Sequence, residues 1–239
     1  EIDAANVAGL IPGTDPERRD EVVAYTAHFD HLGIGTPDQS GDSIYNGFSD
    51  NAAGTAMLLA IASAMRDNPP ARSVLFLFFT GEERGLLGST YYATEPLVPL
   101  EQTVAVINLD AGAPPAPPLE WNISGGIRST LGQLARDVAD AHGWIANPTD
   151  ARPNSDHWPF LKRGVPAAFI IPGPRWEGVN SNEREALRLR WDRYHQPSDH
   201  WDEDFPFAGL ERYATFALEL GRAVANADER PRILPPDDR

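Results

Sequence analysis

One run of eight residues, Ser73–Thr80, constrains the fold more than any other part of the sequence. It reads Ser-Val-Leu-Phe-Leu-Phe-Phe-Thr and contains no charged residue. This continuous apolar character predicts a strand that is buried on both faces, as in parallel α/β sheets. Gly81, Glu82 and Glu83 follow directly. Because open α/β sheets build their sites at the carboxyl edge, the strand is expected to deliver two carboxylates there. A glutamate pair after a strand is commonly a solvated loop, so its meaning depends on which other residues reach the same edge.

Strand-like and helix-like segments alternate along the rest of the chain. Buried apolar runs predict strands, and apolar residues at helical spacing predict helices. The further strands are expected over 21–27, 103–109 and 167–171, and the helices over 51–66, 86–93, 131–138 and 210–224. This alternation predicts a three-layer α/β/α sandwich, with a mixed but mostly parallel central sheet and helices on both faces. A single domain over residues 1–239 is expected, with a loosely held, proline-rich tail over 229–239.

Composition narrows the classes of partner. A formal net charge of −15 makes nucleic acids and anionic membranes poor partners, and no apolar run approaches the ~18–20 residues that a membrane helix needs. The chain has no cysteine, so a metal site would have to use histidine and carboxylate. Because the sequence begins with Glu1 and not with Met, we expect that a leader was removed and that the protein is secreted or periplasmic. A monomer is expected.

Acidic or histidine-bearing segments lie at predicted strand ends or helix starts. If the sheet is largely parallel, four of them meet at its carboxyl edge and the fifth can fold onto it. Two histidines with three or four carboxylates, and no sulfur, favour zinc or another divalent ion. The five segments are His28-Phe29-Asp30-His31, Ser49-Asp50-Asn51, Glu82-Glu83, Asn108-Leu109-Asp110 and Tyr194-His195.

Each of these residues also has an ordinary structural explanation. Asp50 would cap the helix that follows it, and Asp110 would be a turn residue at the end of a strand. His28 would be a hydrogen-bonded histidine at a strand end, and His195 a loop residue after an arginine-rich stretch. It is the coincidence of all five segments that favours a metal site.

The order of these motifs resembles that of the secreted dinuclear-zinc aminopeptidases, metallopeptidase family twenty-eight. The motifs are His-x-Asp, Ser-Asp-Asn, Gly-Glu-Glu, Asn-Leu-Asp and a late Tyr-His. Longer matches cover residues 50–55, 81–89 and 155–160, the last leading to 164–166, and the resemblance runs from about Asn6 to about Tyr213. It implies a zinc-exopeptidase-like fold and an enzyme that releases N-terminal residues from peptides with a free amino terminus.

The resemblance also implies a division of roles around two zinc ions. Asp50 would bridge both ions, with one oxygen for each. His28 and Asp110 would complete one zinc site, and Glu83 and His195 would complete the other. Two such cations polarise the scissile carbonyl and lower the pKa of a bridging water towards ~7.

Two carboxylates would act without binding zinc. Glu82 would be the general base that takes the water's proton and passes it to the leaving amine. Asp30 would fix the tautomer of His28. His31 is a rival ligand to His28 on the same loop, and His28 is favoured because the family's histidine directly follows the strand.

Other residues have weaker claims on the site. Asp156 and His157 would start a helix or line the pocket wall and are not expected to bind metal. His142 and His200 are expected to be structural or solvated. Some relatives carry an aromatic hydroxyl before the Ser-Asp-His segment, where this chain has residues 150–154; oxyanion stabilisation would then fall to the zinc ions, to Arg152 or to a residue not identified. The charged stretch 176–191 is expected to form a short helix that narrows the pocket.

Two alternative functions stay open. Zinc glutaminyl cyclases share the fold and have a run similar to Pro159–Pro166, but they work with one zinc and have an aromatic residue before the late histidine, a position that Tyr194 fits loosely. A non-catalytic binding relative would have lost ligands or the base, whereas all six candidate residues are present here.

Overall fold

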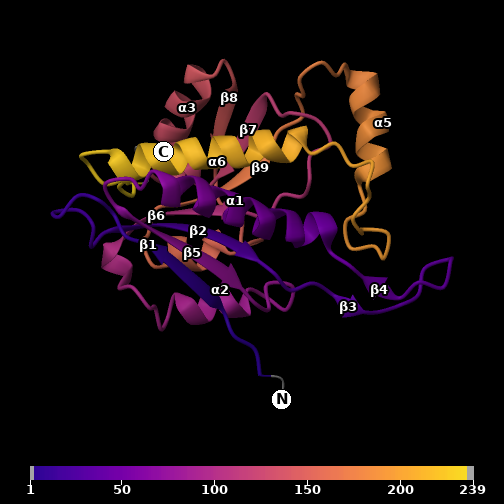
Figure 1. The fold of residues 1–239 in the computed structure, drawn as a ribbon, viewed down its shortest axis with the longest axis horizontal. Helices are drawn as coiled ribbons and strands as arrows, with labels where there is room; N and C mark the ends of the chain where they lie inside the picture. The colour runs from indigo at the N-terminus through magenta and orange to yellow at the C-terminus, as the bar shows by residue number, and fades with distance from the viewer. Residues whose placement is uncertain (1–2, 236–239) are drawn as a thin grey trace.

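A seven-stranded sheet forms the centre of the molecule in the computed structural model, which describes residues 3–235 (Figure 1). The spatial order is β1-β5-β2-β6-β9-β7-β8. Strands β5, β2, β6 and β9 are parallel, whereas β1 and β7 run antiparallel to their neighbours β5 and β9. The bounds are Val7–Ile11 for β1, Val22–His28 for β2, Ser73–Phe79 for β5, Thr103–Leu109 for β6, Glu120–Ser124 for β7, Ile145–Thr149 for β8 and Ala167–Pro172 for β9.

Helices cover both faces of this sheet, so the predicted α/β/α sandwich is confirmed (Figure 1). One face carries α1 (Ala53–Asp67), α3 (Leu131–Ala141) and α6 (Ala208–Asn226), and the other carries α2 (Leu87–Tyr92) and α4 (His157–Lys162). Helix α5 (Ser181–Trp191) lies within the stretch 176–191, where a short helix was expected, and stands apart from these layers. The short elements are β3 (Gly33–Ile34), β4 (Ile44–Tyr45), η1 (Phe48–Ala52), η2 (Leu100–Gln102) and η3 (Gly126–Arg128).

The core explains why the central strands read as continuous apolar runs. All seven residues of β2 and of β6 are buried. Successive side chains along a strand point to opposite faces of the sheet. Those on one face pack under α1 and α6, where Tyr25, Leu58 and Phe216 are fully buried. Those on the other face pack under α2 and α4, around Phe79 and Phe160. Because both faces of these strands are covered, their carboxyl ends have a fixed position in space.

The edges of the sheet are less evident in the sequence. Strand β1 is exposed along most of its length and pairs with β5. Strand β8 lies at the opposite edge and contains Pro148, which fits an edge position because proline has no N–H to donate. Among the described residues, no helix has the length and apolarity needed to cross a bilayer.

The predicted loose tail is held in its first part. Thr130 and Arg232 are joined by a backbone hydrogen bond, and the Leu234 N–H donates to the Arg128 carbonyl. The Arg230 side chain binds the carboxylate of Glu21 at 2.8 Å. Backbone groups near η3 thus provide partners for residues up to 235, and the loosely held tail stays a prediction. The expected domain and tail extend to residue 239, whereas residues 1–2 and 236–239 lie outside the described range.

Candidate metal centre

The carboxyl ends of three parallel strands bring the predicted residues together. His28 is the last residue of β2, and Asp110 directly follows β6. Glu82 and Glu83 follow β5 after Gly81, whose φ of 69° is a left-handed conformation that glycine adopts without strain. Asp50 comes from η1, the turn that leads into α1. The convergence expected from a parallel sheet is thus what the fold produces.

A first group of potential ligands surrounds His28. Its Nε2 atom lies 2.9 Å from Asp110 Oδ1 and 3.1 Å from Asp50 Oδ1. The His28 side chain is 1% exposed, and the two carboxylates are also nearly buried. Burial alone would lower the pKa of His28, but the neighbouring carboxylates of Asp110, Asp30 and Asp50 outweigh it and raise this pKa. Burial conversely raises the pKa of Asp110.

A second group surrounds the other oxygen of Asp50. His195 Nε2 lies 3.1 Å from Asp50 Oδ2 and 3.2 Å from Glu83 Oε2. The backbone of His195 has a φ of 54°, which is unusual for a residue other than glycine. His31 also belongs here, because its Nδ1 atom lies 2.7 Å from Glu83 Oε1. His28 and His31, which the sequence offers as rival ligands for one site, therefore lie in different groups.

The two groups have the chemistry of a divalent-ion site. In each, the potential ligand atoms lie within 4.8 Å of one another, and Asp50 is common to both. His195 Nε2 is buried and makes no hydrogen bond within the described part of the chain, although it faces two carboxylates. Nitrogen and carboxylate oxygen donors in this proportion suit zinc and similar ions. The residues present therefore fit a pair of ions that share Asp50, and their metal binding stays a prediction.

Asp50 is not the cap of helix α1. The side chain of Asn51 accepts a hydrogen bond from the Gly54 N–H at 3.0 Å and donates to the Leu109 carbonyl, also at 3.0 Å. The neighbouring residue thus takes the capping role, and the Asp50 carboxylate is left to face the histidines. The peptide bond between Asp50 and Asn51 is cis.

Asp30 has a different principal contact from the one predicted. Its carboxylate accepts hydrogen bonds from the N–H groups of Glu82, at 3.1 Å, and Glu83, at 3.3 Å. His28 Nδ1 lies 3.1 Å from the backbone carbonyl of Asp30 and 3.7 Å from its carboxylate. Asp30 therefore anchors the loop after β5, and its main-chain oxygen is the group in hydrogen-bond range of His28.

Glu82 is partly buried beside the first group. Burial, followed by the negative charge of Asp110, raises the pKa of Glu82 to about 8, and Asp156 and Glu83 add to the effect. His28 opposes it. A carboxylate whose charged form is disfavoured accepts protons readily, which is the property that a general base needs.

Comparison with known proteins places the chain in a family. The profile of Peptidase family M28 matches residues 6–220. The chain belongs to this family. The sequence is 30% identical over 196 residues to probable leucine aminopeptidase 2 of Aspergillus oryzae, a match that covers 78% of this chain and 36% of that protein. It is 27% identical over 183 residues to Aminopeptidase YwaD of Bacillus subtilis, covering 75% and 36%. The chain thus spans about a third of the length of these relatives.

Solved structures share the M28 fold seen here. A zinc aminopeptidase from Bacillus subtilis superposes with a TM-score of 0.70 at 24% identity, covering 94% of this chain and 51% of that one. A glutaminyl cyclase from an Acidobacteriales bacterium superposes with a TM-score of 0.65 at 22% identity, covering 92% and 73%. The resemblance seen in the motifs is therefore confirmed at the level of family and fold.

A buried hydrogen-bond chain supports Asp110 in this M28 domain. The Ser155 hydroxyl donates to Asp110 Oδ2 at 2.5 Å and accepts from the Asn108 side-chain amide at 2.6 Å. Asn108 in turn accepts from the Thr26 hydroxyl at 2.7 Å. All three supporting side chains belong to fully buried residues. Ser155 therefore orients Asp110, and the Ser-Asp-His segment was the only sequence signal for this supporting role.

Asp199 is a second supporting residue that sequence reasoning missed. Its side chain is almost fully buried and accepts hydrogen bonds from the Ser49 N–H and hydroxyl, at 3.0 and 2.8 Å, and from the Asp50 N–H, at 3.3 Å. Its own carbonyl accepts from the Phe48 N–H at 3.0 Å. Asp199 thus joins the loop of His195 to the turn that carries Asp50.

The remaining predicted residues lie outside both ligand groups. Asp156 and His157 are fully buried; burial raises the pKa of Asp156 to about 7 and lowers that of His157 to about 4. His142 stacks on a tryptophan at the end of α3, and His200 is exposed. Arg152 is exposed in the loop before α4.

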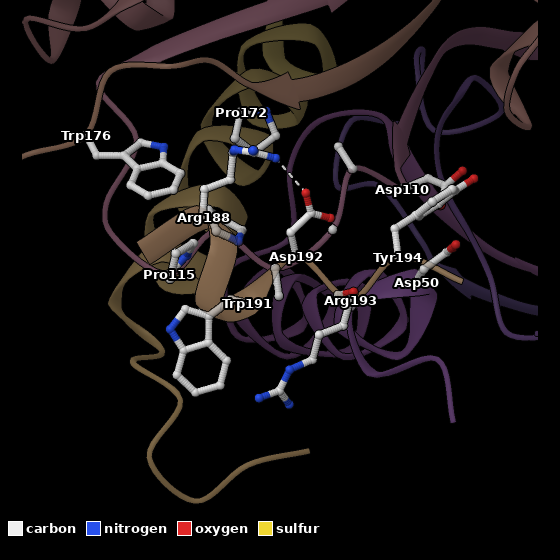
Figure 2. Close-up of a pocket in the computed structure, with 15 residues that line it drawn as sticks. Asp50, Asp110, Pro115, Pro172, Trp176, Arg188, Trp191, Asp192, Arg193 and Tyr194 are labelled. Carbon is white, nitrogen blue, oxygen red and sulfur yellow. Dashed lines mark hydrogen bonds and ion pairs between the residues drawn. The ribbon is translucent and has the colours of Figure 1, made fainter. Parts of the chain in front are cut away.

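A cavity of about 400 Å³ opens beside the two groups in this M28 structure (Figure 2). Asp50, Asp110 and Tyr194 lie at one end of it, and Trp176 and Trp191 lie toward the other. The Tyr194 ring stacks on His195 with centroids 3.8 Å apart. The rest of the wall is mainly apolar. It includes the proline-rich loop after Asp110 and the ion pair between Arg188 and Asp192 at the end of α5. The residues concerned are Ala111, Gly112, Ala113, Pro114 and Pro115 in the loop, Arg188 and Asp192 in the pair, and also Pro172 and Arg193.

Proposed function

We propose that this chain is the catalytic domain of a metalloaminopeptidase that binds two divalent ions, with zinc as the expected metal, and that Glu82 is its general base. One observation carries the proposal. The two oxygens of Asp50 lie 3.1 Å from nitrogens of two different histidines, His28 and His195. A single carboxylate that belongs to two complete ligand groups is what a shared pair of ions requires.

The residues around the pair support a hydrolytic mechanism. Bound ions would supply Lewis acidity that polarises the scissile carbonyl and makes a water molecule more acidic. Glu82 would accept the proton of the attacking water and pass it to the leaving amine, a contribution of about 10²–10⁴-fold. Its pKa, raised to about 8 by burial and by Asp110, falls when cations occupy the neighbouring groups, so the carboxylate is ionised in the loaded enzyme.

The cavity supports an amino-terminal substrate. Its carboxylate-rich end favours the cationic terminus of a peptide, and its mainly apolar wall fits the first side chain of that peptide. The aminopeptidase names of the relatives and the zinc aminopeptidase among the similar structures support the same reading. A secreted or periplasmic location remains part of this proposal.

The test combines metal counting with two substrates. The zinc-loaded protein is expected to hold two ions and to release 4-nitroaniline from leucine 4-nitroanilide. Glu82→Gln is expected to keep both ions and lose about 10²–10⁴-fold in turnover, whereas the exposed control Glu95→Gln should keep wild-type rates. Cyclisation of a glutaminyl peptide with one bound ion and no anilide release would point to a glutaminyl cyclase. Metal binding without turnover of either substrate would point to a binding protein.

A further inference from the structure

We propose that His31 is a fourth protein ligand of the second ion, together with Asp50, Glu83 and His195. The inference rests on the two-ion part of the proposed function and makes the two sites unequal. The first ion would have three protein ligands, and the second would have four. His31 is not needed to explain either the family membership or the chemistry described above.

The contacts of His31 point into the second group. Its Nδ1 atom lies 2.7 Å from Glu83 Oε1, while the other oxygen of Glu83 lies 3.2 Å from His195 Nε2. One carboxylate thus faces both imidazoles. The His31 side chain is only 7% exposed, and its Nε2 atom is buried without a hydrogen-bond partner among the described residues. A potential ligand atom of His31 lies within 4.8 Å of those of Asp50, Glu83 and His195.

The surrounding backbone fixes the ring in this position. The Cβ atom of a side chain at Gly47 would lie 2.7 Å from His31 Cγ and 2.9 Å from His31 Cβ, so only glycine permits this approach. Gly47 also has a φ of 67°, which favours glycine for an independent reason. On the other side, Asp30, the residue just before His31, accepts a hydrogen bond from the Glu83 N–H and so ties the loop of Glu83 to this segment. The imidazole is therefore held between η1 and the loop after β5.

Four protein donors change what each ion can do. Zinc sites with four protein ligands are typically closed, whereas catalytic zinc sites keep three and leave a position for water or substrate. The ion at His28, Asp50 and Asp110 would therefore keep the open position, and it lies on the side of Glu82. The second ion would be held more tightly and would exchange more slowly. The alternative is that His31 only orients Glu83 through a hydrogen bond.

X-ray absorption at the zinc edge separates these two roles. In the fully loaded wild-type protein, three imidazoles shared between two ions are expected, from His28, His31 and His195. His31→Asn and His31→Gln should each reduce the count to two and weaken the tighter of the two binding steps by at least about 10–100-fold in a chelator competition. The matched control His142→Asn, at the end of α3, should change neither.

The outcomes distinguish this inference from the proposed function. Two ions with only two imidazoles in the wild type would overturn the role of His31 and leave the aminopeptidase proposal standing. So would variants that lose affinity while the imidazole count stays the same, since that is the behaviour of an orienting residue. A wild-type protein that binds no ion would instead remove the two-ion proposal itself. The wild-type count decides the matter even if neither variant folds.

Discussion

Ser155 is the residue on which the orientation of Asp110 depends most directly. Its hydroxyl both donates to Asp110 and accepts from Asn108, inside a fully buried environment. Ser155→Ala is expected to leave two buried polar groups without a partner, which costs about 1–3 kcal/mol of the free energy of unfolding. It should also weaken the first ion's binding by about 10–100-fold, as losses of ligand-supporting groups typically do. Urea unfolding of the ion-free protein and zinc titration measure the two effects.

Ser129 offers a matched control at the same scale. It is also buried, but its hydroxyl has no hydrogen-bond partner within the described residues. Ser129→Ala is therefore expected to keep or slightly increase the free energy of unfolding and to leave zinc affinity unchanged. Equal losses in the two variants would show that serine burial, and not the bond to Asp110, accounts for the effect.

At the scale of elements, the loop after α5 and the turn η1 form one unit. Asp199 accepts four hydrogen bonds from the turn through its side chain and carbonyl, although Ser49 and Asp199 are 150 residues apart in sequence. Asp199→Asn keeps the shape but presents an N–H₂ group to backbone donors. We expect a loss of about 1.5–3 kcal/mol in the free energy of unfolding, because bonds to a buried charge are the stronger kind. Binding of the second ion should weaken as well, since its ligands come from both elements.

Asp202→Asn is the control for this prediction. Asp202 lies on the same loop, but its side chain is 29% exposed and its contact to Arg193 is long, at 3.6 Å. Surface ion pairs contribute about 0–1 kcal/mol, so this variant is expected to stay close to wild type in chemical denaturation and in zinc binding. A comparable loss at both positions would contradict a specific role for Asp199.

Elements that are covered on both sides are the ones that the sequence predicts well. Strands β5 and β6 read as apolar runs because almost every one of their side chains is buried. Strand β1 gives no such signal, since it is mostly exposed and exists only through pairing with β5. The same distinction holds for the site. Candidate ligands at strand ends can be predicted from sheet topology, whereas the placement of His31 and the contacts of Asp199 depend on how irregular loops pack together.

At the scale of the whole molecule, the candidate metal centre lies at the carboxyl end of the sheet, and a buried group of charged residues around Arg72, here called the latch, lies at the opposite end. Arg72, just before β5, is almost completely buried. Its guanidinium donates to Glu21 at 2.5 Å, to the Val224 carbonyl at 3.1 Å and to the Ala227 carbonyl. Arg230 donates to the other oxygen of Glu21 at 2.8 Å. The amino ends of β2 and β5 are thereby fastened to the end of α6, and the stability of this latch can be altered without touching the ligands.

The latch predicts a specific dependence of stability on pH. Burial raises the pKa of Glu21, but hydrogen bonds from Arg72 and Arg230 outweigh it, so the net pKa is lower than 4.5. A carboxylate with a lowered pKa contributes stability above its unfolded pKa and loses it as the pH falls through the folded value.

Glu21→Gln leaves the buried Arg72 without its counter-charge, which is expected to cost roughly 3–5 kcal/mol of the free energy of unfolding at pH 7. The difference from wild type should shrink below about pH 4.5, because protonation then removes from wild-type Glu21 the charge that the variant already lacks. Denaturant unfolding of the ion-free proteins from pH 7 to pH 3 measures this difference. Glu95 is exposed, and Glu95→Gln is the control, whose difference from wild type should stay near zero. A difference between Glu21→Gln and wild type that is the same at pH 3 as at pH 7 would mean that the Glu21 charge does not stabilise the latch, and that the buried arginine is compensated by the carbonyls of α6 alone.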